Sequence, residues 1–271
     1  MGKTIFITGA SSGLGKASAK LFQENGWNVA ATMRKPESET ELNELDNVKL
    51  YRMDVTNLEQ IGKAAEDAIS DFGKVDVVLN NAGYGLAGAL EAISDTQITN
   101  QIQTNLLGVI RVTKSFLPHF RVNKSGLFIN VTSIGGLITF PLFSLYHATK
   151  WALEGFSESL WFEMQVIGVG VKTISPGGIR TDFAGRSLDM ATNPELTQYN
   201  DLTAKMMAMF GDPERQKAHS TSRQIAEVIY EAATDGKDQL RYVAGEDAKE
   251  MFRQRQAAGD QGFMKALQMG L

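Results

Sequence analysis

The chain has 271 residues, of which 43% are hydrophobic and 21% charged. This composition excludes a disordered chain and suits one large α/β domain or two small ones. With 27 Lys and Arg against 31 Asp and Glu, the net charge of −4 gives no basic surface for nucleic acid or anionic lipid. The absence of cysteine excludes disulfides and thiolate ligands, and three histidines without metal-site spacing predict no metal centre.

Short apolar runs that alternate with stretches of helical periodicity predict seven β-strands, at 4–8, 29–32, 48–51, 75–79, 127–131, 169–174 and 241–244. Between the first two runs, Leu14, Ala17 and Leu21 fall on one helix face. Strands separated by helices favour a parallel sheet. We therefore expect an α/β fold, a Rossmann-type doubly wound parallel sheet of seven strands with helices on both faces.

A run of 25 residues between Lys124 and Lys150 contains no charged side chain. Its length alone suggests a membrane helix. However, Asn130, Ser133 and Tyr146 are polar and the run has two glycines in its middle, so it is predicted to be a strand, a loop and the start of a helix. With no secretory signal pattern at residues 1–15, we expect a cytoplasmic protein without a membrane span.

No repeat, linker or charge block divides the chain, so residues 1–271 are expected to form a single domain. Residues 182–222 have no clear strand pattern and are rich in small, polar and Met residues. A helical lid on the substrate side is expected there. Residues 245–271 form a C-terminal tail, for which a terminal helix and a substrate-side cover both remain open.

A glycine-rich loop follows the first predicted strand and leads directly into an amphipathic helix. Such a loop lets backbone N–H groups approach a pyrophosphate at the positive end of a helix. The residues expected to bind the cofactor there are Gly9, Ser11, Ser12, Gly13, Leu14 and Gly15. A turn that simply needs glycine is the alternative, but the strand before it and the helix after it favour binding.

The end of the second predicted strand indicates which nucleotide is bound. A carboxylate at this point would bind the adenosine ribose of NAD, whereas an arginine suits the 2′-phosphate of NADP. The strand here ends Met33-Arg34-Lys35, and Arg34 offers a planar fork for a phosphate. NADP(H) is therefore expected, with NAD(H) the less favoured cofactor.

Tyr146 and Lys150 lie four residues apart, on one face of a predicted helix. Ser133 lies 13 residues before Tyr146, at the end of an apolar strand where a parallel sheet presents its ligand-binding edge. The Tyr–Lys spacing alone occurs by chance too often to decide anything, but its position relative to Ser133 favours catalysis. His147 is not expected to be a catalyst, because it points away from the Tyr146 and Lys150 face.

With these motifs the sequence resembles the short-chain dehydrogenase/reductase family, in its shorter, single-domain branch. The matching motifs, in order and spacing over residues 4–181, are Thr8-Gly-Ala-Ser-Ser-Gly-Leu-Gly15, Asp54-Val55, Asn80-Asn-Ala-Gly83, Asn105, Ser133, Tyr146-x-x-x-Lys150 and Pro176-Gly-Gly-Ile-Arg-Thr181. In finer detail, residues 31–34 and 81–90 look most like the hydroxysteroid and retinol dehydrogenase side of the family.

The resemblance implies hydride transfer between a nicotinamide cofactor and a ketone, aldehyde or alcohol. Tyr146 would act as acid or base with Ser133 as its partner, Lys150 would bind the nicotinamide ribose and lower the pKa of Tyr146, and Asn105 would hold a relay water. The further residues implied for the cofactor are Arg34, Asp54, Val55, Asn81, Ala82, Gly83, Tyr146, Lys150, Pro176, Gly177, Ile179 and Thr181.

Loops that carry substrate contacts in this family are apolar here, which suits an apolar carbonyl or alcohol substrate. The residues expected to line the site are Tyr84, Leu86, Leu90, Ile134, Leu137, Phe140, Leu142, Phe143, Phe183, Met206, Met207 and Met209. The same residues could instead be core.

Two other functions remain open, a catalytically silent NADP-binding sensor or scaffold and a nucleotide-sugar-modifying enzyme of the wider superfamily. The intact set of Ser133, Asn105, Tyr146 and Lys150 argues against the first, and the glycine spacing and short length against the second. The family also implies a homodimer or homotetramer through the helices near Asn105 and Tyr146.

Overall fold

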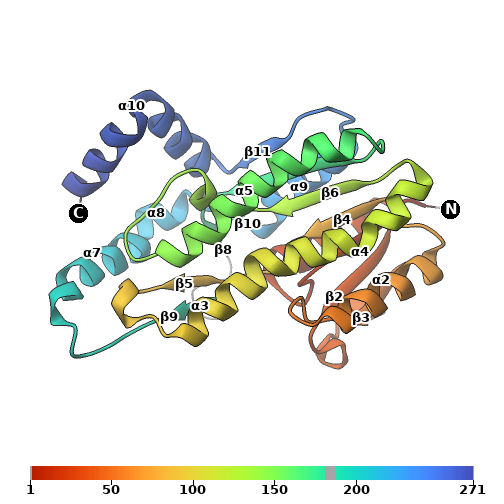
Figure 1. Cartoon of the computed structure of the whole chain (residues 1–271), viewed down its shortest axis with the longest axis horizontal. Coiled ribbons are helices and arrows are strands. Elements are labelled where there is room, and N and C mark those ends of the chain that lie inside the picture. The colour runs from red at the N-terminus through yellow and green to blue at the C-terminus, as the bar shows by residue number, and fades with distance from the viewer. Residues whose placement is uncertain (1, 181–186, 271) are drawn as a thin grey trace.

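The structure, a computed structural model, describes residues 2–180 and 187–270, and its centre is one sheet of seven strands (Figure 1). The strand order is β11-β7-β6-β4-β1-β2-β3, and every neighbouring pair is parallel. The strands are Thr4–Ile7 (β1), Asn28–Met33 (β2), Val48–Arg52 (β3), Val77–Asn80 (β4), Leu127–Val131 (β6), Gly170–Pro176 (β7) and Arg241–Ala244 (β11). These are the seven predicted strands, so the predicted fold class is confirmed.

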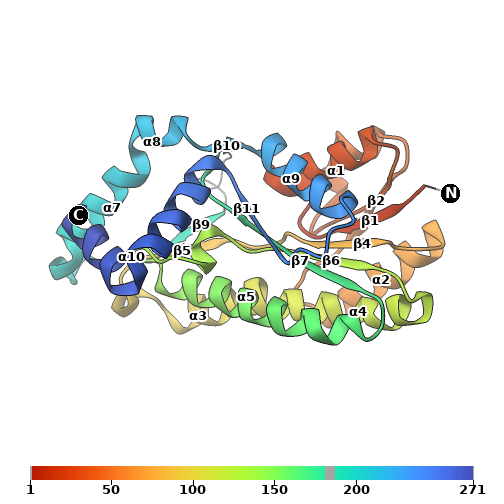
Figure 2. The same ribbon diagram turned by 90° about the horizontal axis from the view of Figure 1, so that it is seen from above.

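Helices cover both faces of the sheet, as the doubly wound prediction requires (Figure 2). One face is covered by α1 (Gly13–Glu24) and α9 (Ser222–Thr234), and the other by α2 (Leu58–Phe72), α4 (Gly108–Asn123) and α5 (Ser144–Gln165). Each layer encloses its own apolar core. Phe22 and Ile229 are buried on the first side, and Phe116 and Phe128 on the second.

The strand order reverses direction between β1 and β4, because the chain winds from β1 outward to β3 and then returns to β4 on the other side of β1. Ligands of open α/β sheets bind at this switch point, beyond the carboxyl ends of the strands. The carboxyl ends of β1, β4, β6 and β7 all point to the same edge. The loops at that edge therefore carry the candidate site.

The segment expected to be a helical lid contains the helices α7 (Asn200–Gly211) and α8 (Pro213–Lys217). The expectation that it contains no strand was wrong. Residues Leu188–Met190 (β9) pair with Gly85–Ala87 (β5), and Ser220–Thr221 (β10) pair with Ile179–Arg180 (β8). Strands of two or three residues are too short to show an alternating pattern in sequence, so only their partners define them.

The C-terminal tail forms α10 (Glu246–Gly270), which bends at Gly259, where φ is 65°. Ala248 and Phe263 of this helix are buried against Ile134 and Ile138, in the segment that follows Ser133. Figure 2 shows α10 at the same end of the molecule as α7 and α8. The tail thus contacts the edge of the sheet that carries the site.

The uncharged run between Lys124 and Lys150 forms β6, a 3-10 turn at Ile134–Gly136 and the start of α5, as predicted. Among the described residues, no helix is both long enough and apolar enough to cross a membrane.

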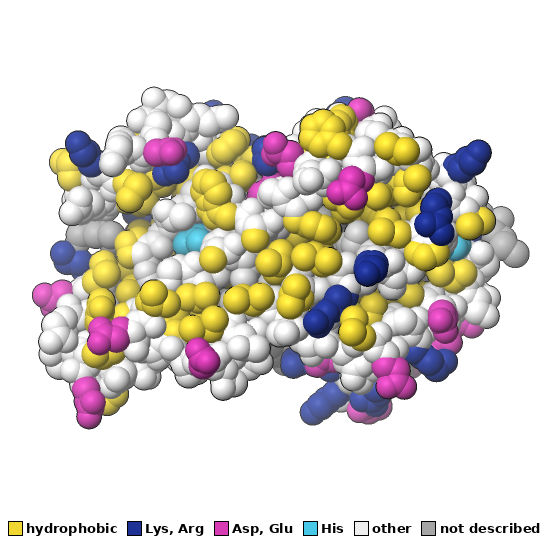
Figure 3. All heavy atoms as spheres, viewed as in Figure 1, with side chains coloured by type: hydrophobic (Ala, Val, Ile, Leu, Met, Phe, Trp, Pro, Cys, Tyr) yellow, Lys and Arg dark blue, Asp and Glu magenta, His cyan; other side chains and the backbone are white. Residues whose placement is uncertain are grey.

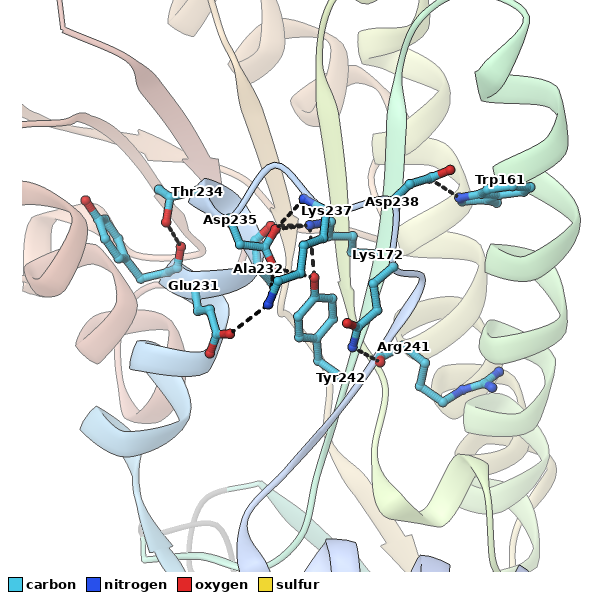
Figure 4. Close-up of polar contacts among 12 residues, drawn as sticks. Trp161, Lys172, Glu231, Ala232, Thr234, Asp235, Lys237, Asp238, Arg241 and Tyr242 are labelled. Atoms are coloured by element: carbon cyan, nitrogen blue, oxygen red, sulfur yellow. Dashed lines mark hydrogen bonds and ion pairs between the residues drawn. The ribbon is translucent and has the colours of Figure 1, made fainter.

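A buried ion pair joins the start of β7 to the end of α9 (Figure 4). The Lys172 ammonium contacts Asp235 at 2.6 Å, the Tyr242 hydroxyl at 3.1 Å and the carbonyl oxygen of Ala232 at 2.8 Å. Burial alone would raise the pKa of Asp235, but hydrogen bonds from Lys172 and Tyr242 lower it to about 2. The cluster lies in the amino-terminal half of β7, away from the candidate site. It fastens β11 and the end of α9 to β7.

We predict that Lys172→Met lowers the free energy of unfolding by about 3–5 kcal/mol, because it removes the buried cation of Asp235 and leaves only the more distant, exposed Lys237 at 3.8 Å. Urea unfolding followed by circular dichroism measures this loss. Lys63→Met, which breaks an exposed pair with Asp67, is the matched control and should cost less than about 1 kcal/mol. Equal losses in the two variants would contradict the prediction.

Candidate active site

The loop between β1 and α1 turns tightly because two of its glycines have positive φ, 69° at Gly9 and 53° at Gly13. At Gly15 a Cβ would lie 2.3 Å from the carbonyl oxygen of Gly9, so no side chain fits. Ser12 occupies the N-cap position of α1, and its side chain forms no capping hydrogen bond there. The N–H groups of the first turn are thus not capped by Ser12 and remain available to an anion.

Residues after β4 hold this glycine loop in place. The Asn81 side-chain amide donates to the carbonyl oxygens of Thr8 at 2.9 Å and Gly9 at 3.1 Å. The Thr8 hydroxyl accepts the backbone N–H groups of Asn81 and Ala82, both at 2.9 Å. The two segments predicted to contact the cofactor are therefore brought together, and the Asn81 side chain supports the loop.

Arg34 lies exposed at the end of β2, at the position that the sequence assigns to a ribose phosphate. The glutamates at 37, 39 and 41 follow it, and they pair with Arg52 or Lys16. In the described part of the chain, no carboxylate forms an ion pair with the Arg34 guanidinium. Its charge therefore remains available for an anion.

Asp54 and Val55 follow β3 at the same edge of the sheet. The Asp54 carboxylate accepts the backbone N–H of Thr56 at 2.9 Å and its hydroxyl at 2.7 Å, which shapes the turn before α2. Val55 is buried against Gly108 of α4, where a Cβ would lie 3.0 Å from the valine side chain. The contacts of Asp54 shape the turn after β3, and Val55 packs against α4 at the same edge as the glycine loop.

Ser133 follows β6, and Tyr146 and Lys150 lie in the first two turns of α5. The Lys150 ammonium donates to the carbonyl oxygen of Val131 at 3.0 Å and lies 5.8 Å from the centre of the Tyr146 ring. The Ser133 side-chain oxygen accepts the N–H of Gly135 at 3.0 Å. The structure thus brings together the three residues that the sequence selects, from two elements.

Asn105 lies in a π-helical turn, Gln103–Leu107, between α3 (Asp95–Ile102) and α4. Its side chain accepts the N–H of Tyr84 at 3.0 Å and donates to the carbonyl oxygen of Tyr84 at 2.8 Å. A Cβ on Gly83 would lie 3.1 Å from Asn105 Oδ1 and 3.8 Å from Lys150 Nζ. Gly83 therefore separates Asn105 from Lys150. The π-helical turn itself was not predicted, although such turns often occur at functional sites.

Burial raises the pKa of Tyr146, and a side-chain hydrogen bond with Ser133 acts in the opposite direction. The family resemblance implies a pKa of Tyr146 that Lys150 lowers, and burial acts in the opposite direction. The Lys150 ammonium is hydrogen-bonded to Val131 and lies over the tyrosine ring. Burial also lowers the pKa of Lys150 to about 8, while the charge of Glu154 acts to raise it.

Pro176 is the last residue of β7, Gly177 follows it and Ile179 begins β8 at the same edge, and Thr181 lies outside the described residues. The Gly178 N–H donates to the Asp247 carboxylate of α10 at 2.7 Å. A Cβ on Gly177 would lie 2.4 Å from that carboxylate. The segment after β7 is therefore held by the C-terminal helix.

His147 does not face the reactive groups, as predicted. Its Nδ1 lies 2.7 Å from the carbonyl oxygen of Gly135, and its Nε2 accepts the N–H of Phe140 at 2.8 Å. Burial lowers the pKa of His147, which keeps the ring neutral and able to accept that bond. The imidazole fastens the loop after Ser133 to α5.

Aromatic rings border the candidate substrate side. Phe143 lies 6.3 Å from Tyr146 and 5.2 Å from Phe210 of α7, measured between ring centres, and Phe140 lies 6.1 Å from Phe210. A separate shallow hollow of about 450 Å³ lies between residues 139–144 and the first two turns of α5. Neither Ser133 nor Tyr146 lines it.

Some residues expected to line the substrate site belong to the core instead. Leu86 is fully buried with Ile93 and Ala191, and Ile134 is buried against α10. Leu90 is 61% exposed. Phe183 lies outside the described residues. The apolar loop pattern did not distinguish pocket from core, because both need the same residue types.

Sequence reasoning missed two carboxylates that contact the site. Glu154 lies buried one helical turn after Lys150, and Asp247 holds the segment after β7. The four-residue spacing from Lys150 could have indicated Glu154. No local signal identifies Asp247, because its contact joins residues 69 positions apart.

The sequence profile of the short chain dehydrogenase family matches residues 3–191. The chain belongs to the short-chain dehydrogenase/reductase family of oxidoreductases. An uncharacterized oxidoreductase of Schizosaccharomyces pombe is 42% identical, over 88% of this chain and 100% of that protein. A 3-ketodihydrosphingosine reductase of Bacteroides thetaiotaomicron is 35% identical, over 79% of this chain and 78% of that protein.

Solved structures agree with this family assignment. A short-chain dehydrogenase from Streptomyces avermitilis is 31% identical, with a TM-score of 0.84 over 95% of this chain and 93% of that one. The structure of ElxO with NADP bound is 28% identical, with a TM-score of 0.73 over 90% of this chain and 98% of that one. Both NADP-bound and NADH-bound proteins occur among such structures.

Gly135 allows the loop after Ser133 of this short-chain dehydrogenase to lie directly on α5. A Cβ there would lie 2.9 Å from His147 Nδ1 and 3.2 Å from Tyr146 Cε1. We predict that Gly135→Ala displaces Ser133 or Tyr146 and lowers kcat at least about tenfold, because small misplacements of reacting groups are costly. Steady-state kinetics at saturating cofactor measures this effect.

Gly62→Ala is the matched control, because Gly62 lies inside α2, away from the site, with no atom within 4 Å of its added Cβ. That variant should keep full activity and gain roughly 0.5–1 kcal/mol of stability. Full activity in Gly135→Ala would contradict the close approach described above.

Proposed function

We propose that the protein interconverts a ketone or aldehyde and an alcohol, with NADP(H) as its cofactor and Tyr146 as the acid and base. The observation that carries the proposal is the gathering of Ser133, Tyr146, Lys150 and Asn105 at the sheet edge beside the glycine loop. Each of these residues is common, but their convergence from three separate elements beside a dinucleotide cradle is specific.

The bound cofactor would supply or accept the hydride, and the glycine loop with Arg34 would hold its phosphates. The Ser133 oxygen already accepts an N–H from Gly135, which orients its own hydroxyl proton toward a hydrogen-bond acceptor. That hydroxyl would bind the carbonyl oxygen and polarise it. The Tyr146 phenol, whose pKa is raised by burial, would be protonated at neutral pH and donate its proton to the same oxygen.

Lys150 and Asn105 would act around the phenol. The Lys150 ammonium donates one N–H to Val131, so its other two N–H groups can bind the ribose hydroxyls of the cofactor. Asn105 fixes the backbone of Tyr84 at the end of the segment after β4. It would also hold the water through which Lys150 exchanges protons with solvent.

An apolar substrate is proposed because Phe140, Phe143 and Phe210 border the side of the site nearest Tyr146. One relative is a 3-ketodihydrosphingosine reductase, an enzyme named for a ketone substrate. The helices of residues 182–222 would cover this side as a lid, and α10 would form a wall of the same single domain.

A homodimer or homotetramer is proposed to form through α4 and α5. Figure 3 shows hydrophobic side chains gathered over the face on which these helices lie. Trp151 is 43% exposed and Phe162 is 65% exposed. Phe156 and Trp161 are packed against the core, which leaves Trp151 and Phe162 as the exposed aromatic candidates for such an interface.

Tyr146→Phe tests the proposed chemistry, because it removes only the hydroxyl group that would donate the proton. Turnover of an apolar ketone with NADPH should fall by about 10²-fold or more, while NADPH binding, followed by fluorescence titration, should persist. Tyr199→Phe, which alters an exposed hydroxyl bound to Glu91, is the control and should keep wild-type turnover. Unchanged turnover in Tyr146→Phe would overturn the assignment.

Arg34→Asp tests the cofactor preference. The KM for NADPH should rise at least about tenfold and the preference should move toward NADH, because a carboxylate repels the 2′-phosphate and binds the free ribose hydroxyls. Lys114→Asp makes the same charge change on the exposed surface of α4 and should change neither KM. If Arg34→Asp leaves the NADPH preference intact, Arg34 does not bind the phosphate.

A further inference from the structure

Glu154 is a buried carboxylate that the proposed reaction does not use. It lies in the middle of α5 with 5% of its surface exposed, one helical turn after Lys150. Its carboxylate accepts the hydroxyl of Thr132 at 2.6 Å and that of Ser175 at 2.9 Å. A buried charge that finds so many donors is strongly constrained in position.

The two hydroxyl donors come from the ends of two central strands. Thr132 is the residue immediately before Ser133, and Ser175 is the residue immediately before Pro176. The Thr132 hydroxyl also lies 3.0 Å from the Ser175 hydroxyl, so the two strand ends and the carboxylate form one cluster. The Thr173 hydroxyl adds a longer contact at 3.3 Å.

The fourth partner is a cation from the edge strand. Arg241 of β11 contacts the Glu154 carboxylate at 3.0 Å through Nε, and its Nη2 lies 3.5 Å from the exposed Glu158. Glu154 therefore links α5 to β6, β7 and β11 at once. Movement of any of these elements would shift the carboxylate away from one of its donors.

Among the described residues, few charged or titratable groups surround Lys150. Its own helix contributes Tyr146 and Glu154. The neighbouring elements contribute uncharged groups, namely the Val131 carbonyl of β6 and the Asn105 amide beside Gly83. Arg241 and Glu158 lie beyond Glu154. Glu154 is therefore the carboxylate that acts on the ammonium.

We propose that Glu154 is a positioning residue for the reaction: it ties the strand ends that carry Ser133 and Pro176 to α5, and its charge acts on Lys150, which lies one helical turn before it on the same buried face of α5. This inference rests on the proposed function, since it concerns the same site. A hydrocarbon side chain of similar size could fill the space between helix and sheet, but it could not bind three hydroxyls or oppose the lysine charge.

The direct test measures the titration of Lys150 without any activity assay. The ¹³Cε resonance of labelled lysine, assigned by its loss in Lys150→Arg, reports the midpoint at which the amine loses its proton. We expect a midpoint near pH 8 in the wild-type protein, from the burial that lowers the pKa of Lys150. Glu154→Gln removes the charge that raises this pKa, so the midpoint should fall by about one pH unit.

Glu158→Gln is the matched control. It removes the same charge, one turn further along α5 and beside the same Arg241, but from a side chain that is 62% exposed. Solvent screens such a charge, so the Lys150 midpoint should stay within about 0.2 units of the wild-type value. Equal midpoints in wild-type protein, Glu154→Gln and Glu158→Gln would overturn the proposal.

The pH dependence of kcat/KM should shift in the same direction as the Lys150 midpoint. Carbonyl reduction loses activity as Lys150 loses its charge, so the alkaline limb of kcat/KM should move to lower pH in Glu154→Gln and stay in place in Glu158→Gln. Glu154→Asp keeps the charge on a side chain that is one methylene shorter. The alkaline limb of its kcat/KM profile should therefore stay at the wild-type pH, while kcat falls about tenfold. An alkaline limb that does not move in Glu154→Gln, or wild-type kcat in Glu154→Asp, would also count against the proposal.

Two further variants separate a failure of this inference from misfolding and from a failure of the proposed function. If Glu154→Gln fails to fold, Arg241→Gln takes its place: without that cation, Glu154 acts more strongly on Lys150 and the midpoint should rise, whereas an unchanged midpoint would overturn the proposal. If Tyr146→Phe retains full turnover, the proposed function fails whatever Glu154 does. If Tyr146→Phe is inactive but the Lys150 midpoint is the same in the wild-type protein and in Glu154→Gln, only this inference fails.

Discussion

Helix α5 lies against the carboxyl ends of β6 and β7. The turn Ile134–Gly136 lies between β6 and α5, and at Gly136 it approaches the helix so closely that no side chain would fit. A Cβ on Gly136 would lie 2.9 Å from the carbonyl oxygen of Lys150. The same contact holds the Lys150–Val131 hydrogen bond and the His147 bonds to the turn. The relative positions of serine, tyrosine and lysine therefore depend on this one helix–sheet contact, which tolerates little displacement because protein interiors are close-packed.

Two buried lysines of this chain show how surroundings determine what a charge can do. Lys172 has a carboxylate, a phenol and a carbonyl oxygen as direct partners, so its charge is compensated and it fastens the sheet. Lys150 has only a carbonyl oxygen as a described hydrogen-bond acceptor, and burial lowers its pKa to about 8. A group whose pKa is lowered toward neutral pH can exchange a proton during a reaction.

The sequence predicts the sheet well because each strand is a local pattern of four to seven residues followed by a turn or helix signal. Gly9, Ser133, Tyr146 and Lys150 could likewise be found, because glycines and reactive side chains stand at strand ends or at helical spacing. The contacts of Asp247 with Gly178 and of Arg241 with Glu154 join residues 69 and 87 positions apart. Local patterns carry no information on such pairs.

The direction in which the pKa of Tyr146 shifts also depends on a contact between separate elements. From sequence, the four-residue spacing places an ammonium near a phenol, and Coulomb attraction then predicts a lowered pKa. In the structure the ammonium is directed to Val131, and burial raises the pKa of the phenol instead. Spacing along a helix determines which residues share a face, but the orientation of a long lysine side chain depends on acceptors from another strand. Electrostatics at this site is therefore a property of the α5–β6 contact and not of the Tyr-x-x-x-Lys motif alone.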